Sequence, residues 1–435
     1  KRWGYFPSGA VAWIITEENF MKDYSNIVSY LKLRGSVGKT GSQNLGAYDW
    51  RTLMGSATYN GAAGIVPSSL GNDILQWEEQ IQKEVGLDYG FWDDRIRGTL
   101  GYYQKKVDNL LYSDPVPTSS SFSSVYQNIG SLKNRGIEFD VRVDIIKNVQ
   151  KDLTWNVDFN IARNRTTLEK LNSSDGYFGG GAYDYFKIEE GGETGRFYGY
   201  KDAGRLFMTN EELVGLKTID PKTGTLKYYR DDYNYERQGD VYIMDLDGDG
   251  QITADGDRTV IGNANPDFFG GFGSTLYWKG LMLNAVFSYS VGGDRFWDEE
   301  KNSSGDMNVY NTSNRILDSW TVNPGVNASY PRAMYYGWGS NSIITDRYIH
   351  DASYLRMTAL NLSYRLPKHL YKNSILNAVE FTFQATNLFT WTKYPGMDPQ
   401  GNFSTTYSAF YNMGIDYSTY PSARTYNFGI KLTLK

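Results

Sequence analysis

The sequence of 435 residues predicts an all-β chain that folds as a transmembrane, antiparallel β-barrel with long extracellular loops. Apolar and polar side chains alternate along it with a period of two. Several alternating runs reach the roughly 9–11 residues that a tilted strand needs to cross a membrane. Aromatic residues gather at the ends of the runs, where Trp and Tyr favour the lipid head-group layer. Since successive side chains of a strand face opposite sides, each run has one apolar and one polar face.

The expected strands follow one another along the whole chain. The clearest alternation lies at 137–145, 153–161, 379–385 and 428–434. Similar segments lie near 31–39, 79–92, 95–107, 267–278, 281–292 and 354–366, which brings the total to about a dozen strands. At Ala359-Leu360 the alternation slips by one position, and this slip predicts a β-bulge.

The connections between these strands alternate in length. Tight turns are predicted at 92–95, 147–150 and 278–280, and long polar loops at 108–128, 166–265 and 293–353. Short turns on one side and long loops on the other are typical of outer-membrane barrels. Alternation also fits a soluble sandwich, whose apolar face would point into a core. The alternative is therefore a secreted, soluble, β-rich protein that binds carbohydrate or hydrolyses glycosides and carries a structural calcium loop.

The composition excludes several classes of function. Lys and Arg total 44 against 49 Asp and Glu, a net charge of −5, so we expect no nucleic-acid partner. The absence of Cys excludes disulfides, thiolate zinc sites and Cys nucleophiles. His350 and His369, the two His residues, are interpreted as polar surface residues, and adjacent acids such as Glu299-Glu300 as solvated turns. These patterns favour a protein that is not an enzyme.

One motif has the spacing of a cation-binding loop. Carboxylates occupy positions 1, 3 and 5 of an EF-hand-type loop, with Gly at position 6 and an apolar residue at position 8. These residues are Asp245, Asp247, Asp249, Gly250 and Ile252, and Gln251 at position 7 would offer its backbone carbonyl. Position 12 is Gly256, between Asp255 and Asp257. Because the flanking segments look extended, the motif predicts a structural Ca²⁺ site on a loop, with a solvated acidic turn as the alternative.

The long loop at 293–353 is rich in aromatic residues. The candidate substrate contacts within it are Trp297, Trp320, Tyr335, Tyr336 and Trp338. Aromatic faces stack on sugar rings and on peptide side chains, while Asn and Asp supply hydrogen bonds. The alternative is that these rings pack the loops together or against a partner protein.

A set of segments spread over the chain carries a family resemblance. The segments are Arg2–Ser8, Leu31–Gly38, Asn128–Glu138, Asp267–Phe272, Ser353–Tyr364, Asn387–Phe389 and Tyr394–Pro399. In this order they resemble the SusC/RagA-like TonB-dependent outer-membrane transporters of Bacteroidetes-type bacteria. The resemblance also points to Asp257 as the last acid of the calcium loop.

The resemblance implies that residues 1–435 are the C-terminal part of a 22-stranded barrel with a plugged lumen. The plug domain and the N-terminal strands would then lie outside this sequence, so we expect Lys1 to be internal to a longer polypeptide. Because the family usually finishes on an aromatic residue, we expect one further residue after Lys435.

The function implied by the resemblance is active import across the outer membrane of a Gram-negative, Bacteroidetes-type cell. The cargo would be nutrient oligomers, either oligosaccharides or peptides, and the TonB complex would supply the energy. The expected partners are a SusD-like surface lipoprotein, which closes over the extracellular mouth, and outer-membrane lipid. An adhesin or assembly component that reuses the barrel without transport is a third possibility.

Overall fold

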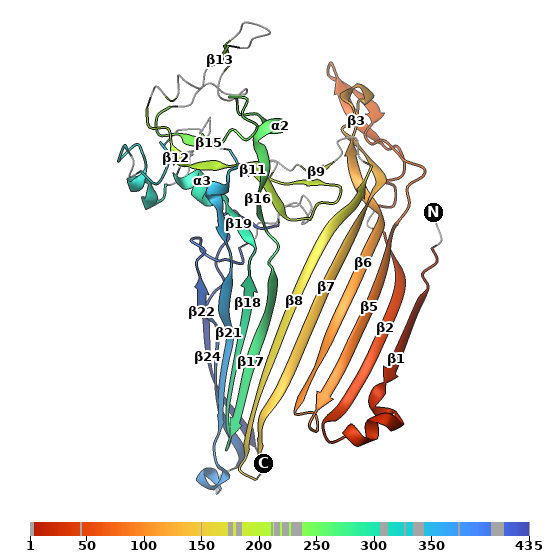
Figure 1. Ribbon diagram of the computed structural model, residues 1–435, viewed down its shortest axis with the longest axis vertical. Coiled ribbons are helices and arrows are strands. Elements are labelled where there is room, and N and C mark those ends of the chain that lie inside the picture. The colour runs from red at the N-terminus through yellow and green to blue at the C-terminus, as the bar shows by residue number, and fades with distance from the viewer. Residues whose placement is uncertain are drawn as a thin grey trace.

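The main element of the protein is one antiparallel sheet of 11 strands, the wall of a β-barrel (Figure 1). The computed structural model describes residues 4–434 apart from 44–45, 149, 173–176, 180–184, 210–211, 213–217, 220–225, 228–236, 305–311, 326–327, 334–342, 373–374 and 402–412. The wall strands are β1 (Ser8–Ile14), β2 (Val28–Ser42), β5 (Glu78–Phe91), β6 (Ile96–Pro115), β7 (Ser124–Asn148), β8 (Leu153–Leu171), β17 (Phe268–Trp278), β18 (Leu281–Val291), β21 (Tyr354–Arg365), β22 (Leu376–Thr392) and β24 (Thr425–Leu434). They lie side by side in this chain order.

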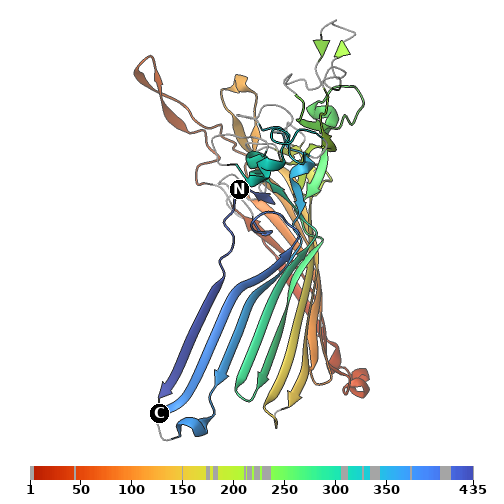
Figure 2. The same cartoon turned by 90° about the vertical axis from the view of Figure 1, so that its left-hand side faces the viewer.

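The two ends of the wall differ. The tight turns and the C-terminus lie at one end, and the long connections rise above the other (Figure 2). In the turn between β5 and β6, Trp92, Asp93 and Asp94 all have positive φ, between 52° and 58°. Lys279 and Gly280 have φ of 48° and 87° in the turn between β17 and β18, as a two-residue hairpin turn requires. The predicted tight turns at 92–95 and 278–280 are therefore confirmed.

The register of the wall separates an apolar from a polar face. Leu33, Leu87, Leu100, Phe139 and Ile161 are cross-strand neighbours in one row, so their side chains share a face, which we call the apolar face. The neighbouring row on the opposite, polar face contains Lys32, Asp88, Thr99, Asp140 and Asn160. The alternation seen in the sequence thus becomes two chemically distinct surfaces.

The apolar face carries large side chains in the open. Val85, Ile137 and Phe381 are 56%, 49% and 44% exposed. Among the described residues, every sheet other than the wall has two or three strands, so the wall has no second sheet of similar size above it. A soluble sandwich would bury this face, and lipid is the solvent that suits it. The predicted transmembrane β-barrel fold is confirmed.

The predicted bulge is also confirmed. The register between β18 and β21 shifts between Val286 and Phe287, and the register between β21 and β22 shifts between Met357 and Ala359. Thr358 is the additional residue, and its hydroxyl donates a hydrogen bond to the carbonyl of Val286 at 3.1 Å. The bulge resets the alternation, so apolar residues return to the apolar face on both sides of it.

The prediction of a long loop at 108–128 is wrong, because most of this segment belongs to strands. β6 continues to Pro115 and β7 begins at Ser124, so these 20- and 25-residue strands form a hairpin that extends past the rest of the wall. Outside lipid a strand needs backbone pairing but no apolar face, which is why the alternation stops before the strand does.

Smaller elements lie above the loop end of the wall. They are the strands β3 (Met54–Tyr59), β4 (Ala62–Pro67), β9 (Tyr177–Gly179), β10 (Lys187–Glu189), β11 (Arg196–Tyr200), β12 (Asp202–Leu206), β13 (Thr218–Ile219), β14 (Leu226–Lys227), β15 (Val241–Ile243), β16 (Arg258–Asn263), β19 (Asp294–Trp297), β20 (Ile349–Asp351) and β23 (Ile415–Asp416), and the helices α2 (Ala254–Asp257) and α3 (Asp298–Ser304). Hairpin β3–β4 turns at Asn60 and Gly61, both with positive φ.

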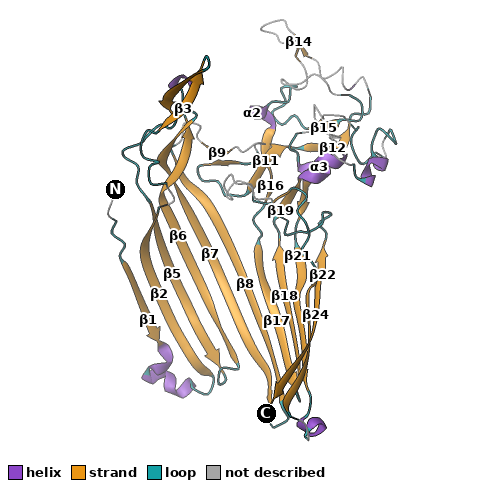
Figure 3. Ribbon diagram, turned by 180° about the vertical axis from the view of Figure 1, so that it is seen from behind, coloured by secondary structure: helices purple, strands orange, loops and turns teal. Residues whose placement is uncertain are grey.

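Helices are short and lie beyond the two ends of the wall (Figure 3). Six-residue and shorter 3-10 helices occur at Ile15–Glu17, Asn19–Tyr24, Thr118–Ser120, Asn314–Asp318, Asp346–Tyr348 and Lys368–Tyr371. Within the described part of the chain, no helix has the length and apolar character to cross a membrane.

The two faces predict opposite tolerances to charge. Phe139→Arg puts a cation on the apolar face and should cost about 2–4 kcal/mol if that face meets lipid. Glu138→Arg, one position along the same strand on the polar face, is the matched control. We expect Phe139→Arg alone to reduce the heat-modifiable barrel recovered from the outer-membrane fraction. Equal recovery of the two variants would contradict the lipid assignment.

Candidate functional site

The elements above the wall form what we call the loop assembly, which consists of β11, β12, β15, β16, β19, β20, β23, α2 and α3. Two apolar clusters hold it together. The first centres on Phe197, Phe296 and Tyr348, each at most 1% exposed. The second centres on Phe207, Val241 and Ile252, also at most 1% exposed, with Trp320 packed against it. These local cores fix the positions of the loop-borne polar residues.

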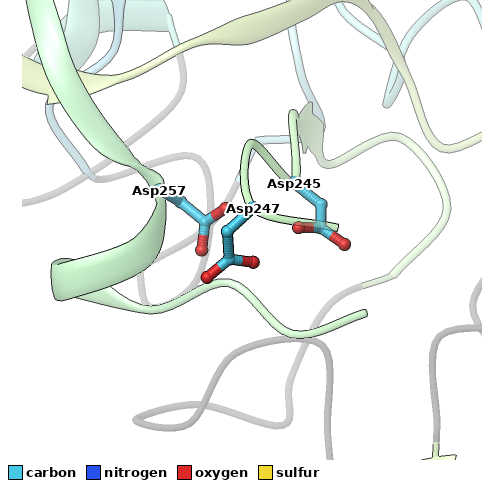
Figure 4. A group of neighbouring side chains, drawn as sticks. All are labelled: Asp245, Asp247 and Asp257. Carbon is cyan, nitrogen blue, oxygen red and sulfur yellow. The ribbon is translucent and has the colours of Figure 1, made fainter. Parts of the chain in front are cut away.

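The predicted acidic loop lies in this assembly, between β15 and β16. The carboxylates of Asp245, Asp247 and Asp257 converge, with one oxygen of each within 4.8 Å of the others (Figure 4). Strands on both sides confirm the prediction of extended flanks. The last acid is reached through the one-turn helix α2, whose N-cap Thr253 accepts the N–H of Gly256 at 3.0 Å. Hard carboxylate oxygens at this spacing can hold a divalent cation.

Backbone N–H groups hold the carboxylates in place. Asp257, which is fully buried, accepts the N–H of Leu246 on one oxygen and that of Thr253 on the other, both at 2.7 Å. Asp245 accepts the N–H groups of Gly248 and Gly250 at 2.7 and 2.8 Å. Both glycines have positive φ, 76° and 80°, which is the conformation that lets the chain wrap around the Asp245 side chain.

The other two predicted ligands lie differently. Asp249 is exposed and is outside the group of three, and its carboxylate accepts the N–H of Gln251 at 2.8 Å. The N–H of Asp249 lowers the pKa of Asp247, but desolvation and the negative charges of Asp249 and Asp257 outweigh it and raise that pKa. Asp247 thus lies among like charges, and a cation bound there would relieve the repulsion.

Trp297, a predicted substrate contact, is packed inside the loop assembly. It is 8% exposed, and the guanidinium of Arg315 lies 4.4 Å from its ring centroid. The rings of His350 and Tyr394 lie 5.9 and 6.1 Å away. This arrangement matches the alternative in which the aromatic residues pack loops together.

Trp320 is half-buried beside Gly239, whose positive φ and lack of a Cβ make room for the indole. The remaining candidates, Tyr335, Tyr336 and Trp338, lie outside the described residues. Substrate contact by Trp297, by Trp320 and by these three residues stays a prediction.

The interpretation of Glu300 as part of a solvated turn is wrong, and His350 is half-buried beside it. Glu300, on α3, is only 6% exposed and accepts hydrogen bonds from Arg315 at 3.1 Å and the Tyr330 hydroxyl at 3.2 Å. Its other oxygen lies 2.5 Å from His350 Nε2. Burial, and then the charge of Glu300, raise the pKa of Tyr330, which therefore stays protonated as a donor. No sequence signal joins these residues, because the chain brings them together from separate elements.

A second buried pair was also missed. Arg356, on β21, is 4% exposed and donates to Asp398 at 2.6 Å, to Gln400 at 2.5 Å and to Thr390 at 2.9 Å. Burial alone would raise the pKa of Asp398, but Arg356 and two backbone N–H groups outweigh it and hold that pKa below its usual value. The pair ties the segment after β22 to the wall. The segments that contain the two residues, Ser353–Tyr364 and Tyr394–Pro399, were both identified in the sequence. The contact between the two segments could not be read from the sequence.

The polar face of the wall is lined with paired charges. Asp88 accepts Arg34 at 3.2 Å and lies 3.4 Å from the Lys32 ammonium, while Arg34 also pairs with Glu84. Arg34, Glu84 and Glu138 border a hollow of about 270 Å³ on this face. Glu138, Asp140, Arg142 and Asp144 lie along β7 on the same face. A surface of this chemistry suits a hydrated lumen.

This architecture, with an uncovered apolar face, a charged polar face, tight turns at one end and loops at the other, defines an outer-membrane β-barrel. The family described as "TonB dependent receptor-like, beta-barrel" matches residues 1–388. The chain therefore belongs to this family.

Curated relatives and solved structures agree with this assignment. TonB-dependent receptor P3 of Formosa agariphila is 33% identical over 99% of this chain and 42% of its own length. TonB-dependent receptor SusC of Bacteroides thetaiotaomicron is 31% identical over 99% of this chain and 40% of its own length. A chain of the RagAB peptide importer in its closed-closed state matches with a TM-score of 0.75 and 27% identity, over 99% of this chain and 43% of that chain.

These findings confirm the SusC/RagA-like resemblance, the fold and the outer-membrane location that the sequence predicted. The chain spans about two fifths of the curated relatives it matches, between 40% and 42% of their length. The relatives carry the names of receptors rather than of enzymes.

The Arg356–Asp398 pair predicts a pH-dependent contribution to stability. The pKa of Asp398 is lower in the folded protein than in the unfolded chain. Ionised Asp398 therefore stabilises the fold at pH values above its unfolded pKa, and this stabilisation is lost as the pH falls through its folded pKa. Asp398→Asn leaves Arg356 buried without an anion and should cost about 3–5 kcal/mol at neutral pH. The temperature at which heating shifts the gel mobility of the barrel measures this loss.

The pair Arg97–Asp144, 3.3 Å apart and more exposed than Arg356–Asp398, provides the control. Asp144→Asn should cost at most about 1 kcal/mol, because solvent screens this pair. On acidification the wild-type transition temperature should fall toward that of Asp398→Asn. If the transition temperatures of wild type and Asp398→Asn differed by a constant amount across the acidic range, the assigned role of Asp398 would be ruled out.

Proposed function

We propose that this chain is the C-terminal part of the barrel of a TonB-driven importer of nutrient oligomers, working with a SusD-like surface lipoprotein. The observation that carries the proposal is the two-faced wall, which matches a chain of the RagAB peptide importer with a TM-score of 0.75. Paired charges such as Arg34–Glu84 on the polar face suit a hydrated passage for a polar oligomer, either an oligosaccharide or a peptide.

The edges of the wall support a larger barrel. Among the described residues, β1 pairs only with β2, and β24 pairs only with β22. An unpaired strand edge in hydrocarbon leaves a row of N–H and C=O groups without partners, which membranes do not tolerate. Further strands of the 22-stranded barrel would satisfy these groups.

The loop end of the wall supports a protein partner. Met54 and Ile65 on the β3–β4 hairpin are 65% and 77% exposed, and Ile74 nearby is 85% exposed. Apolar side chains gathered outside the membrane favour contact with another protein. A lipoprotein that closes over the extracellular mouth is the partner that this position fits.

The importer proposal is tested by uptake in the native host. Deletion of the gene should abolish accumulation of one class of labelled oligomer, either peptides or oligosaccharides, and inactivation of TonB should have the same effect. Uptake of single amino acids and monosaccharides is the control and should not change. Unchanged uptake of both oligomer classes, or glycan hydrolysis by the purified protein, would favour the adhesin or the hydrolase alternative instead.

We also propose that the acidic loop binds Ca²⁺ in a structural role. The converging carboxylates of Asp245, Asp247 and Asp257 are the proposed ligands, and the Gln251 carbonyl and Asp249, at position 5 of the loop, would complete the set. The ion would tie β15 to β16 and so stiffen the loop assembly.

Removal of the cation should loosen this loop. Chelation with EDTA, or Asp247→Asn, should accelerate proteolysis between β15 and β16, and added Ca²⁺ should restore protection in wild type only. Asp255→Asn is the matched control, because Asp255 is exposed on the same loop and outside the converging group. Identical proteolysis with and without EDTA would count against a bound cation.

A further inference from the structure

The apolar face has a hollow over β1, β2, β5 and β6 that the proposed import does not use. Its volume is about 740 Å³, which lies within the range of ligand sites, about 300–1,000 Å³. Its lining on the apolar face includes Gly9, Val11, Gly35, Val37, Val85 and Tyr102. The hollow is therefore open toward lipid rather than toward the polar lumen.

Glycine creates this hollow. Val11, Gly35, Val85 and Tyr102 are cross-strand neighbours in one row, so the glycine leaves a gap between larger side chains. A Cβ at Gly35 would meet nothing closer than 3.9 Å, and one at Gly9 would meet nothing within 4 Å. The floor is thus backbone, and Val11 and Val85, 77% and 56% exposed, form its sides.

The hollow ends at a lysine on the loop side. The next row toward the loops contains Gly9, Val37, Lys83 and Gln104. Lys83 is exposed and, in the part of the chain that the structure describes, forms no ion pair. In the row beyond it, Lys39 pairs with Glu79 at 2.8 Å. An unpaired ammonium on a lipid-facing surface extends toward the head-group layer and favours an anion there.

We propose that this hollow binds a phosphorylated glycolipid of the outer leaflet. One acyl chain lies over Gly35, and a phosphate on the sugar head group accepts hydrogen bonds from Lys83. The apolar sides match the chain, and the ammonium matches the phosphate. The lysine is at the loop end of β5, which begins at Glu78 beside the loops and ends at Phe91 in a tight turn, so its phosphate belongs to the outer leaflet.

Two variants test the two halves of the site. The protein is purified from native outer membranes in mild detergent, and the bound phosphorylated glycolipid is quantified by native mass spectrometry. Lys83→Gln removes the charge and keeps the length of the side chain, and Gly35→Leu fills the hollow. Each variant should lower the amount of bound glycolipid about tenfold. Lys83→Gln does so because the charge-assisted hydrogen bond to the phosphate is lost, and Gly35→Leu because the space for the acyl chain is filled.

The opposite face supplies matched controls. Lys105→Gln removes a lysine beside the hollow on the polar face, and Gly101→Leu adds a side chain where a Cβ would meet nothing within 4 Å. Neither should change the bound glycolipid. A normal heat-dependent mobility shift shows that each variant folds, and Lys83→Gln tests the proposal even where Gly35→Leu does not fold.

Three results would overturn the proposal. Lys83→Gln could retain as much glycolipid as wild type, the bound lipid could be a glycerophospholipid that responds to the same variants, or cross-linking from Val85→Cys could capture a second copy of the chain over the hollow. Unchanged glycolipid in Lys83→Gln would show that the lysine does not bind the phosphate. A bound glycerophospholipid or a cross-linked second copy would show that the hollow has a different occupant.

Discussion

In hydrocarbon a backbone N–H or C=O finds no water to bond, and the rest of this structure depends on that constraint. It is met here by 11 strands that pair with their chain neighbours in one antiparallel sheet. Once each strand is paired, its side chains divide by position into a face for lipid and a face for the lumen. The same strand pairing produces both rows: the apolar row from Leu33 to Ile161 and the polar row from Lys32 to Asn160.

Above the lipid the constraint is lifted, and the chain stabilises itself by other means. The loop assembly has its own apolar clusters, around Phe197 and Phe207, and it buries charge that the membrane would exclude. Glu300 with Arg315 is a pair of this kind, and the buried pair of Arg356 and Asp398 ties the neighbouring segment after β22 to the wall. Such pairs rigidify because neither member can move without leaving a buried charge unpaired. They restrain α3 and the segment after β22 at the loop end of the wall.

The lipid-facing side of the wall is more than a solvent boundary. A uniform row of Leu and Phe would contact any acyl chain equally, whereas Gly35 interrupts the row and Lys83 adds a charge beside the gap. Shape and charge in one place give a surface that distinguishes between lipids. The proposed import passage and the proposed lipid contact thus use opposite sides of the same strands, so a change on one face need not disturb the other.

The sequence by itself determined most wall strands, the two faces, a bulge next to Ala359, the tight turns at 92–95 and 278–280 and the acidic motif at Asp245. Each of these is a local pattern, set by side-chain alternation or by spacing within a few residues. Only the tertiary structure decided that Glu300 is buried and contacts His350, that Arg356 meets Asp398, and that Asp249 lies outside the converging carboxylates. It alone showed the hollow at Gly35, because a gap exists only when neighbours on other strands define its sides. Contacts between residues 42 or 50 positions apart leave no periodic trace in the chain, so register and packing had to be seen in three dimensions.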